Sequence, residues 1–198
     1  MKNFINHIKT IISHRKFVRR LCFKMGLFWQ GLTHDLSKFS PTEMSIAKYY
    51  TGKNSPHQEC RNRLGYSPCW MHHYHINKHH YQYWYDTSET DEFIPIKMPY
   101  KYVLEMFCDR VSACKAYNKD KYTNQDAWNY FVKNTKGHGV MHSDTEYLLA
   151  KLLWMLHECK SEKEFFNHFK QIKTYLQVTY EAGTLEEIDI LTERNCEA

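Results

Sequence analysis

The stretch GLTHDLSKFSPTE, residues 31–43, places a histidine and an aspartate directly before the start signal of a new helix. Its last four residues, 40–43, supply an N-cap serine, a proline suited to the first turn and a glutamate that completes a capping box. This signal predicts a helix to about Gly52, with His34 and Asp35 just before a corner between two helices. A single His-Asp pair is usually solvated or locally hydrogen-bonded, so its meaning depends on the rest of the chain.

Helical spacing dominates on both sides of this corner. Upstream, apolar residues recur every three or four positions, which predicts an amphipathic helix over about residues 3–25 that ends near Gly26. Downstream, Ser67-Pro68 opens a helix with five histidines and an aromatic run, and Pro99 opens another with a clear apolar stripe. Further helix starts follow at Asn124, Ser143 and Ser161.

The remaining segments lack a helical pattern. Residues 53–66 are polar and carry glycine and proline at or near their edges, so they are predicted to form a loop, as are residues 86–98. Residues 183–191, GTLEEIDIL, fit either a short helix or a short strand. The predicted fold class is all-α, with about seven helices in one domain that covers residues 1–198.

The cysteines and the hydropathy pattern narrow the class of protein. Seven cysteines, an odd number without a CxxC pair, predict reduced thiols and not a disulfide framework or a zinc ribbon. Polar and basic residues interrupt the apolar residues of the N-terminus, and no window approaches the roughly 18 apolar residues of a membrane span. We therefore expect a cytoplasmic protein without a membrane partner.

The charge is concentrated in the first third of the chain. The formal net charge is +5, and six basic residues lie close together: Lys9, Arg15, Lys16, Arg19, Arg20 and Lys24. Such a face favours a small phosphate-bearing ligand or, with weaker support, nucleic acid. The alternative interpretation is an ordinary solvated helix face.

Histidine is unusually frequent, with thirteen residues in the chain and five of them within residues 72–80. His72 and His79 are seven residues apart, as are His73 and His80. On an unbroken helix the two members of each pair would share a face and lie about 10 Å apart. Histidines from both ends of that span could contribute to one metal site only if the helix is interrupted between them. Asn77 lies between the ends, and asparagine is tolerated where a helix stops.

Within this cluster we expect His73 and His79 to be metal ligands, followed by His80. His72 and His75 are expected to lie outside the ligand set, as supporting or surface groups. The alternative is a polar helix face that carries histidines without binding a metal.

The candidate ligands follow one another in a characteristic order. His14 lies on the first helix, His34-Asp35 at the corner, the histidine cluster after that, and Asp109 in the helix that starts at Pro99. This order resembles the HD-domain metal-dependent phosphohydrolase superfamily. The resemblance implies two divalent transition-metal ions, Fe, Mn, Co, Ni or Zn, because such ions suit a mixture of imidazole and carboxylate ligands. It implies that His14, His34, Asp35 and Asp109 form one site and that Asp35 bridges to a second, which the cluster completes.

Three local motifs carry a closer resemblance. HDLSKFSP, HHYHINKHHYQYW and KMPYKYVLEMFCDRVSACKAY are similar to an uncharacterised family of small bacterial and phage proteins assigned to the HD fold. The likeness covers about residues 5–120 and implies an HD-like helical bundle with its metal site in that range, helices over 124–180 and a short tail, 181–198. That family typically has a glutamate where this chain has Gln82, so no carboxylate role is carried over there.

The function implied is hydrolysis of a phosphoester, most plausibly of a nucleotide or cyclic nucleotide, by a hydroxide that two metals activate. Asp35 and Lys38 are the expected catalytic residues. Lys38 lies one helical turn after Asp35, where its ammonium can reach a bound anion, although an ordinary solvated lysine fits the sequence equally well. Two alternatives remain open: a mixed-valent di-iron oxygenase of the same superfamily, and a non-catalytic metal-stabilised module that binds a nucleotide.

Overall fold

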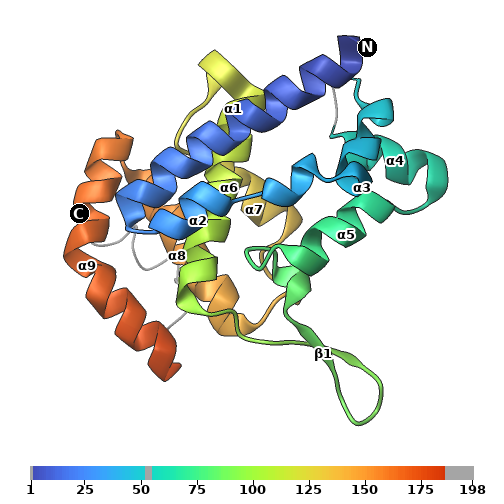
Figure 1. The fold of residues 1–198 in the computed structure, drawn as a ribbon. Helices are drawn as coiled ribbons and strands as arrows, with labels where there is room; N and C mark the ends of the chain where they lie inside the picture. Colours follow the sequence, from blue (N-terminus) through green and yellow to red (C-terminus); the bar gives the residue numbers. More distant parts are fainter. Residues whose placement is uncertain (1, 52–54, 186–198) are drawn as a thin grey trace.

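The computed structural model describes residues 2–51 and 55–185, and these residues are mostly helical (Figure 1). They form nine α-helices, four short 3-10 segments and one two-stranded sheet. The all-α class is therefore confirmed, but the prediction of about seven helices was wrong. Two of the additional elements are α2 (Phe28–Thr33) and α4 (Pro56–Leu64).

Helix α4 falls in a segment that was predicted as a loop, residues 53–66. Pro56 is its first residue and Gly65 ends it in the left-handed conformation, with a φ of 79°. Both are ordinary helix boundary signals. The helix lacks an apolar stripe because it buries only Pro56 and Cys60, and for that reason the apolar periodicity did not reveal it.

The main core lies between five helices. Helix α1 (Lys2–Met25) packs along α6 (Tyr100–Asn118), and α7 (Asp126–Asn134), α8 (Ser143–Glu158) and α9 (Glu162–Ala182) complete the layer around α6 (Figure 1). Fully buried side chains from three of these helices meet there, among them Val18, Cys22, Val103, Phe107, Leu149 and Leu153. The predicted apolar stripes of α1 and α6 both face this core.

A second layer of short elements covers one side of α1. Helix α2 is followed by the 3-10 segment η1 (Leu36–Phe39), by α3 (Pro41–Met44) and by the 3-10 segment η2 (Ser45–Tyr49). The helix predicted from Pro41 thus begins as expected but changes to 3-10 geometry after one turn. Gly31 permits the close approach of α2 to α1, because a Cβ there would lie 3.0 Å from the Cβ of Cys22.

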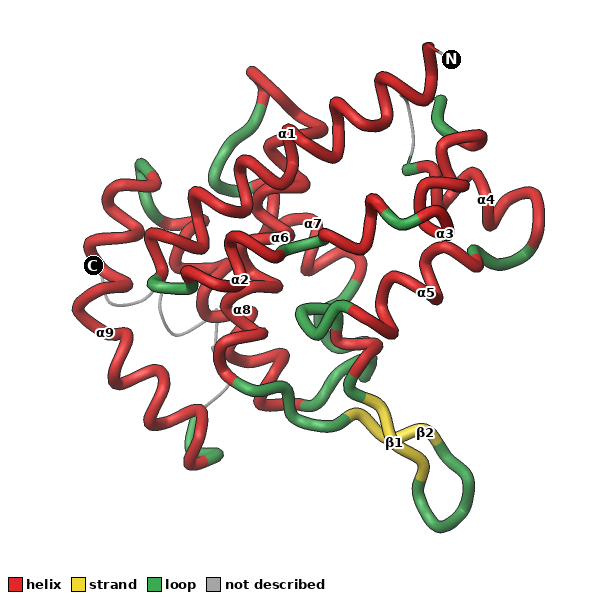
Figure 2. The backbone as a smooth tube through the Cα atoms, in the orientation of Figure 1, coloured by secondary structure: helices red, strands yellow, loops and turns green. Residues whose placement is uncertain are grey.

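The next segment combines a helix with a hairpin. Helix α5 (Pro68–Ile76) starts where Ser67-Pro68 predicted, but it ends before the aromatic run, which forms the 3-10 segment η3 (Tyr81–Tyr83) and its flanks. The predicted loop 86–98 instead contains most of an antiparallel hairpin of β1 (Tyr85–Thr87) and β2 (Phe93–Pro95), which extends away from the helices (Figure 2).

The later helix starts were predicted to within two residues. The Ser161 hydroxyl accepts a hydrogen bond from the Glu164 backbone and caps α9, as the capping box indicates. Helix α8 is capped by His142 and not by Ser143, and α7 begins after Gln125 and not after Asn124. A further 3-10 segment, η4 (Lys119–Lys121), follows α6. Most of the stretch 183–191 lies outside the described residues.

Two chemical expectations about the chain can be compared with this fold. The cysteines at positions 22, 60, 69, 108, 114 and 159 are all free thiols, as the absence of a pairing pattern indicated. Among the helices of residues 2–51 and 55–185, none is both long enough and apolar enough to cross a bilayer.

Candidate metal centre

The fold brings all eight sequence-predicted site residues to one region between α1, α6, η1 and the end of α5. His14 comes from α1 and Asp109 from α6, while His34 ends α2 and Asp35 directly precedes η1. Lys38 lies in η1. The remaining three, His73, His79 and His80, come from α5 and from the turn that follows it.

Three groups of described residues could each hold a metal ion; the first has four members, and the third consists of His34, His79 and Glu105. His14, His34, Asp35 and Asp109 each offer one ligand atom, and these atoms lie within 4.8 Å of one another. The Nε2 of His14 lies 2.9 Å from the Oδ1 of Asp109, and the Nε2 of His34 lies 3.3 Å from the Oδ2 of Asp35. Metal–ligand bonds of about 2.0–2.2 Å place ligand atoms on opposite sides of an ion about 4.2 Å apart. The four ligand atoms, which all lie within 4.8 Å of one another, could therefore surround one ion after a small contraction.

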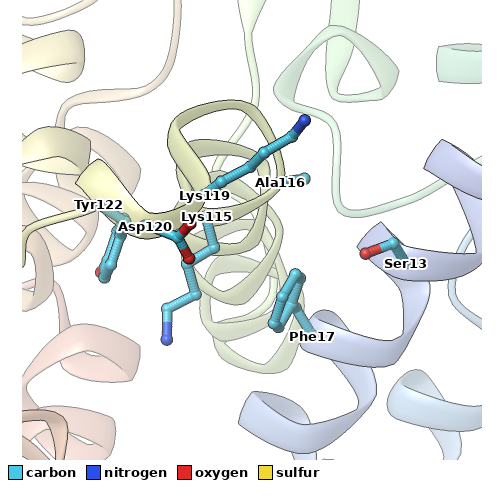
Figure 3. Close-up of a pocket in the computed structure, with 7 residues that line it drawn as sticks. All are labelled: Ser13, Phe17, Lys115, Ala116, Lys119, Asp120 and Tyr122. Atoms are coloured by element: carbon cyan, nitrogen blue, oxygen red, sulfur yellow. The ribbon is translucent and has the colours of Figure 1, made fainter.

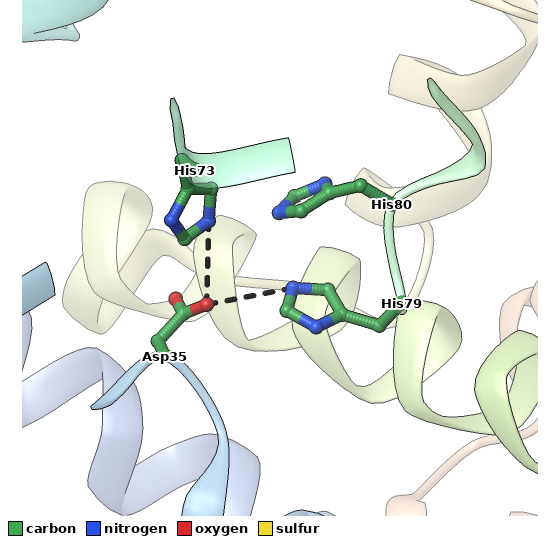
Figure 4. Close-up of side chains that lie close together, drawn as sticks. All are labelled: Asp35, His73, His79 and His80. Atoms are coloured by element: carbon green, nitrogen blue, oxygen red, sulfur yellow. Dashed lines mark ion pairs between the residues drawn. The ribbon is translucent and has the colours of Figure 1, made fainter. Parts of the chain in front are cut away.

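A second group shares Asp35 with the first. Asp35, His73, His79 and His80 also offer ligand atoms within 4.8 Å of one another, and Figure 4 shows these side chains pointing toward a common space. The Oδ1 of Asp35 lies 3.3 Å from the Nε2 of His73 and 3.5 Å from the Nε2 of His79. Because its Oδ2 faces His14 and His34, one carboxylate serves both groups.

Most of the ligand atoms have no hydrogen-bond partner, although the Lys38 ammonium forms an ion pair with the Oδ2 of Asp35. In the described part of the chain, six buried atoms of these residues lack a hydrogen bond: the Nε2 of His14, His34, His79 and His80 and both carboxylate oxygens of Asp35. Buried polar atoms are normally paired, because leaving one unsatisfied costs about 1–3 kcal/mol. Six such atoms, in two groups that share Asp35, fit a site that binds cations.

Two glutamates contact the opposite edges of the histidine rings. The Oε1 of Glu105, on α6, lies 2.9 Å from the Nδ1 of His34 and 3.3 Å from the Nδ1 of His79. The Oε2 of Glu43 lies 2.7 Å from the Nδ1 of His73. An Nδ1–H that donates to a carboxylate leaves the Nε2 lone pair free, which is the tautomer that a metal-binding histidine uses.

Sequence reasoning missed both glutamates as parts of the site. Glu43 was interpreted only as a capping-box residue, and its backbone N–H does donate to the Ser40 hydroxyl. Glu105 carried a usable signal, because it lies four residues before Asp109 and therefore on the same face of α6. His72, which was expected to lie outside the ligand set, contacts the Oε1 of Glu43 at 3.1 Å.

Local backbone geometry explains how distant residues reach this region. Asp35 adopts the left-handed conformation, with a φ of 54°, at the sharp turn between α2 and η1. Aspartate is one of the few non-glycine residues that tolerate this conformation. Asn77 is extended and ends α5, as its position predicted, and its amide donates to the Ser37 hydroxyl and to the His73 carbonyl. The break allows His79 and His80 to turn back toward Asp35.

The electrostatics of the cluster couple its acids and bases. Burial alone would raise the pKa of Asp35, but the charges of His34 and Lys38 outweigh it and hold the pKa well below its usual range. Burial opposes the charge on His34 as well, yet the carboxylates of Asp35, Asp109 and Glu105 raise its pKa well above the ordinary value. His80 differs, because burial and then the neighbouring imidazoles of His79 and His73 lower its pKa well below that value.

Solvent reaches the cluster from one side. The side chains of His34, Asp35, His73 and His79 are at most 2% exposed, whereas that of Asp109 is 19% exposed and that of Lys38 25%. The Nζ of Lys38 lies 2.6 Å from the Oδ2 of Asp35. A molecule that enters from this side therefore meets the Lys38 ammonium next to the shared carboxylate.

A surface hollow of about 560 Å³ lies elsewhere, between α1 and the end of α6 (Figure 3). Its lining includes Phe17, Lys115, Lys119 and Tyr122 but none of the clustered histidines or carboxylates. The Lys115 ammonium is already paired with Glu162. We therefore place the candidate chemistry at the buried cluster and not at this hollow.

The fold and the cluster define an all-α protein with buried groups of histidine, aspartate and glutamate that could hold metal ions. Residues 3–155 match a family described as a family of unknown function, DUF5662, and the chain belongs to that family. The matched range contains every residue of the two ligand groups and both supporting glutamates, and it ends before α9. No curated protein and no solved structure matches the chain.

Proposed function

We propose that this protein is a metal-dependent hydrolase that cleaves a phosphoester. The observation that carries the proposal is the convergence of six buried nitrogen and oxygen atoms without hydrogen bonds, in two groups that share Asp35. The chain order of the proposed ligands, which resembles that of the HD-domain phosphohydrolases, supports the same reaction class. The finer proposal of a nucleotide or cyclic nucleotide as substrate rests on that resemblance.

The proposed cofactor is a pair of divalent transition-metal ions. His14, His34 and Asp109 would hold one ion, His73, His79 and His80 the other, and Asp35 would be shared. Imidazole with carboxylate suits Fe, Mn, Co, Ni or Zn better than the all-oxygen sites that Mg and Ca prefer. When bound, such ions supply Lewis acidity toward a phosphoryl oxygen and make water a competent nucleophile near neutral pH.

The protein side chains would have three roles in this reaction. Glu105 and Glu43 hold the histidine rings in one orientation through their Nδ1 atoms. The nearly complete burial of His34, Asp35, His73 and His79 excludes bulk water from most of the site. Lys38, at the partly exposed side, would donate from its ammonium to a phosphoryl oxygen of the substrate.

The proposal is tested first by metal content and then by turnover. Protein purified without chelator should carry one to two transition-metal ions per chain, and Asp35→Ala should lose both the metal and the activity. Turnover of nucleotides, cyclic nucleotides and phosphomonoesters should persist without oxygen and after reconstitution with Mn or Co, because hydrolysis needs only Lewis acidity. Lys38→Ala should mainly lower kcat/KM for the anionic substrate, whereas Lys48→Ala, at an exposed position of η2, serves as the control.

Two results would count against the proposal. If the protein binds no transition metal after reconstitution, the cluster is a buried polar network and not a metal centre. If metal is present but the whole substrate panel shows no anaerobic turnover, hydrolysis is wrong. Oxygen consumption by an iron-loaded sample would then identify the oxygenase alternative.

A further inference from the structure

The first third of the chain presents an unusual surface, which we call the α1–α2 face. Its apolar part consists of Phe23 on α1, Phe28, Trp29 and Leu32 on α2, and Leu36 and Phe39 in η1, all of them exposed. Trp29 is 71% exposed and Phe28 55%. Figure 1 shows α1 and α2 side by side, and the two helices pack on each other. An exposed apolar surface of this extent usually marks a place of interaction.

Ring contacts link residues within each end of this face. The ring of Phe28 stacks on that of Phe23 at 5.1 Å and meets the edge of Trp29 at 5.5 Å. At the other end, the Arg15 guanidinium lies over the ring of Phe39 at 5.4 Å. Arg15 also donates to the Leu32 and His34 carbonyls, which fixes α2 and η1 against α1.

The charged residues of the segment that carries this surface have one sign. From residue 4 to residue 34 the sequence has six lysines and arginines and no acidic residue, and Asp35, which follows, is buried. Lys16, Arg19 and Arg20 are exposed on α1, and none of them forms an ion pair with another described residue. Lys16, Arg19 and Phe23 follow the three- and four-residue spacing of a single helix face, so the basic and apolar groups lie next to each other.

In contrast to the expectation from the sequence, which was of no membrane partner, we propose that the α1–α2 face docks on an anionic lipid bilayer. Trp, Phe and Leu side chains flanked by lysines and arginines are the composition of surfaces that lie in a membrane interface, where the apolar groups enter the lipid and the basic groups meet its phosphates. Single-stranded nucleic acid fits less well, because Leu32 and Leu36 offer no plane on which a base could stack. This proposal does not depend on the proposed hydrolase function.

Docking would have a consequence for the neighbouring cluster. His34 and Asp35 lie in the chain between the exposed residues Leu32 and Leu36. A bilayer against α2 and η1 would therefore lie close to the chain segment that carries the shared carboxylate.

The experiment is flotation of the full chain with vesicles of phosphatidylcholine alone and with phosphatidylglycerol added. We expect binding to the anionic vesicles to be at least about tenfold tighter, and to weaken with salt, because basic residues near the surface act additively. The double variant Trp29→Ser with Leu32→Ser should abolish binding, and Arg19→Glu with Arg20→Glu should remove the preference for anionic lipid. Both change exposed residues, and circular dichroism would confirm that each variant is folded.

One control variant and three contrary outcomes test whether the α1–α2 face binds lipid. Phe93→Ser, at a side chain 77% exposed on the distant hairpin, should leave vesicle binding unchanged. Absence of binding to anionic vesicles would overturn the proposal. A second contrary outcome is binding to a single-stranded oligonucleotide that requires Trp29, together with vesicle binding that does not require it. This result would assign the face to nucleic acid. Self-association that the Trp29 and Leu32 changes abolish, without vesicle binding, would assign the face to a second copy of the chain.

Discussion

At the scale of single residues, Glu105 connects the two ligand groups of the candidate centre, a role that its residue type alone does not indicate. One of its oxygens contacts the Nδ1 of both His34 and His79, and these histidines belong to different ligand groups. The orientation of the two groups is therefore coupled through one carboxylate. Glu105 also forms a third group of possible ligand atoms with these two histidines.

Glu105→Gln tests this coupling. The amide keeps the shape of the side chain but removes the charge, so the fold should persist while metal affinity falls about 10- to 100-fold. Metal titration in competition with a chromogenic chelator would measure the change. Glu146→Gln is the matched control, because Glu146 is also a buried glutamate but contacts the Gly137 backbone, far from the ligands in sequence. Equal metal loss in both variants would show that Glu105 has no special role.

His57 provides a prediction about pH. Burial, followed by the positive charge of Lys38, lowers its pKa to about 3, and its Nδ1 contacts the Ser67 hydroxyl at 3.0 Å. The folded chain therefore keeps this imidazole neutral where the unfolded chain takes up a proton, at pH values between about 3 and 6.5. Stability from this group is complete above pH 6.5 and is lost as the pH falls below it.

Urea unfolding of the chelated protein would measure the effect. Between pH 7.5 and 5.5 the wild-type chain should lose about 1 kcal/mol of unfolding free energy relative to His57→Gln, in which no proton can bind at this position. His138→Gln, at an exposed position, is the control. A difference between wild type and His57→Gln that stays constant across this range contradicts the prediction.

The residues of the candidate site differ in how far the sequence could predict them. His14, His34, Asp35 and Asp109 follow a recognisable order, and Asn77 correctly indicated the break that ends α5. Glu105 shares a face of α6 with Asp109, but this spacing alone does not assign it, because a glutamate on a helix is usually solvated and its tertiary contact with two histidines is what distinguishes it. Its burial depends on how α6 meets α2, which no local pattern encodes.

At the scale of elements, the boundaries depend on short capping sequences more than on apolar stripes. The capping box at Ser161 predicted the start of α9, and the proline at position 68 that of α5. Helix α4 has boundary signals of the same kind but almost no buried face, and it was missed. The hairpin of β1 and β2 was missed because three-residue strands are too short to show alternation.

Ser161→Ala tests the capping of α9. The change removes the acceptor of the Glu164 N–H, so it should cost about 1 kcal/mol of unfolding free energy, measured by thermal or urea denaturation. Ser161→Asp should retain most of the wild-type stability, because aspartate is an equally good N-cap. If the alanine and aspartate variants are equally destabilised, the hydrogen bond is not the cause.

At the scale of the whole molecule, the cluster joins four segments that pack on different sides of it. Residues from α1, the α2–η1 turn, the end of α5 and α6 all contribute, so an ion bound there would be lost on unfolding. The unfolded chain cannot hold the same groups together, and the metal should therefore stabilise the fold by mass action.

Metal removal tests this linkage. At a free metal concentration about 100 times Kd, the unfolding free energy should rise by about 2.7 kcal/mol over that of the chelated protein. Asp109→Ala should respond less, since it lacks one carboxylate of the first ligand group. Calcium is the control ion and should have little effect on a centre rich in imidazole. Identical melting temperatures with Mn, with Co and with chelator would contradict the metal assignment.

The wide spacing of the ligands along the chain also has a consequence during protein synthesis. His34 pairs with a glutamate 71 residues further on, and His14 with Asp109 on the same helix as that glutamate. At a translation rate of about 5–20 residues per second, the first histidines leave the ribosome several seconds before their partners exist. A nascent chain in that interval exposes unprotected imidazoles, and any loading with metal would have to wait until α6 has emerged and docked on α1.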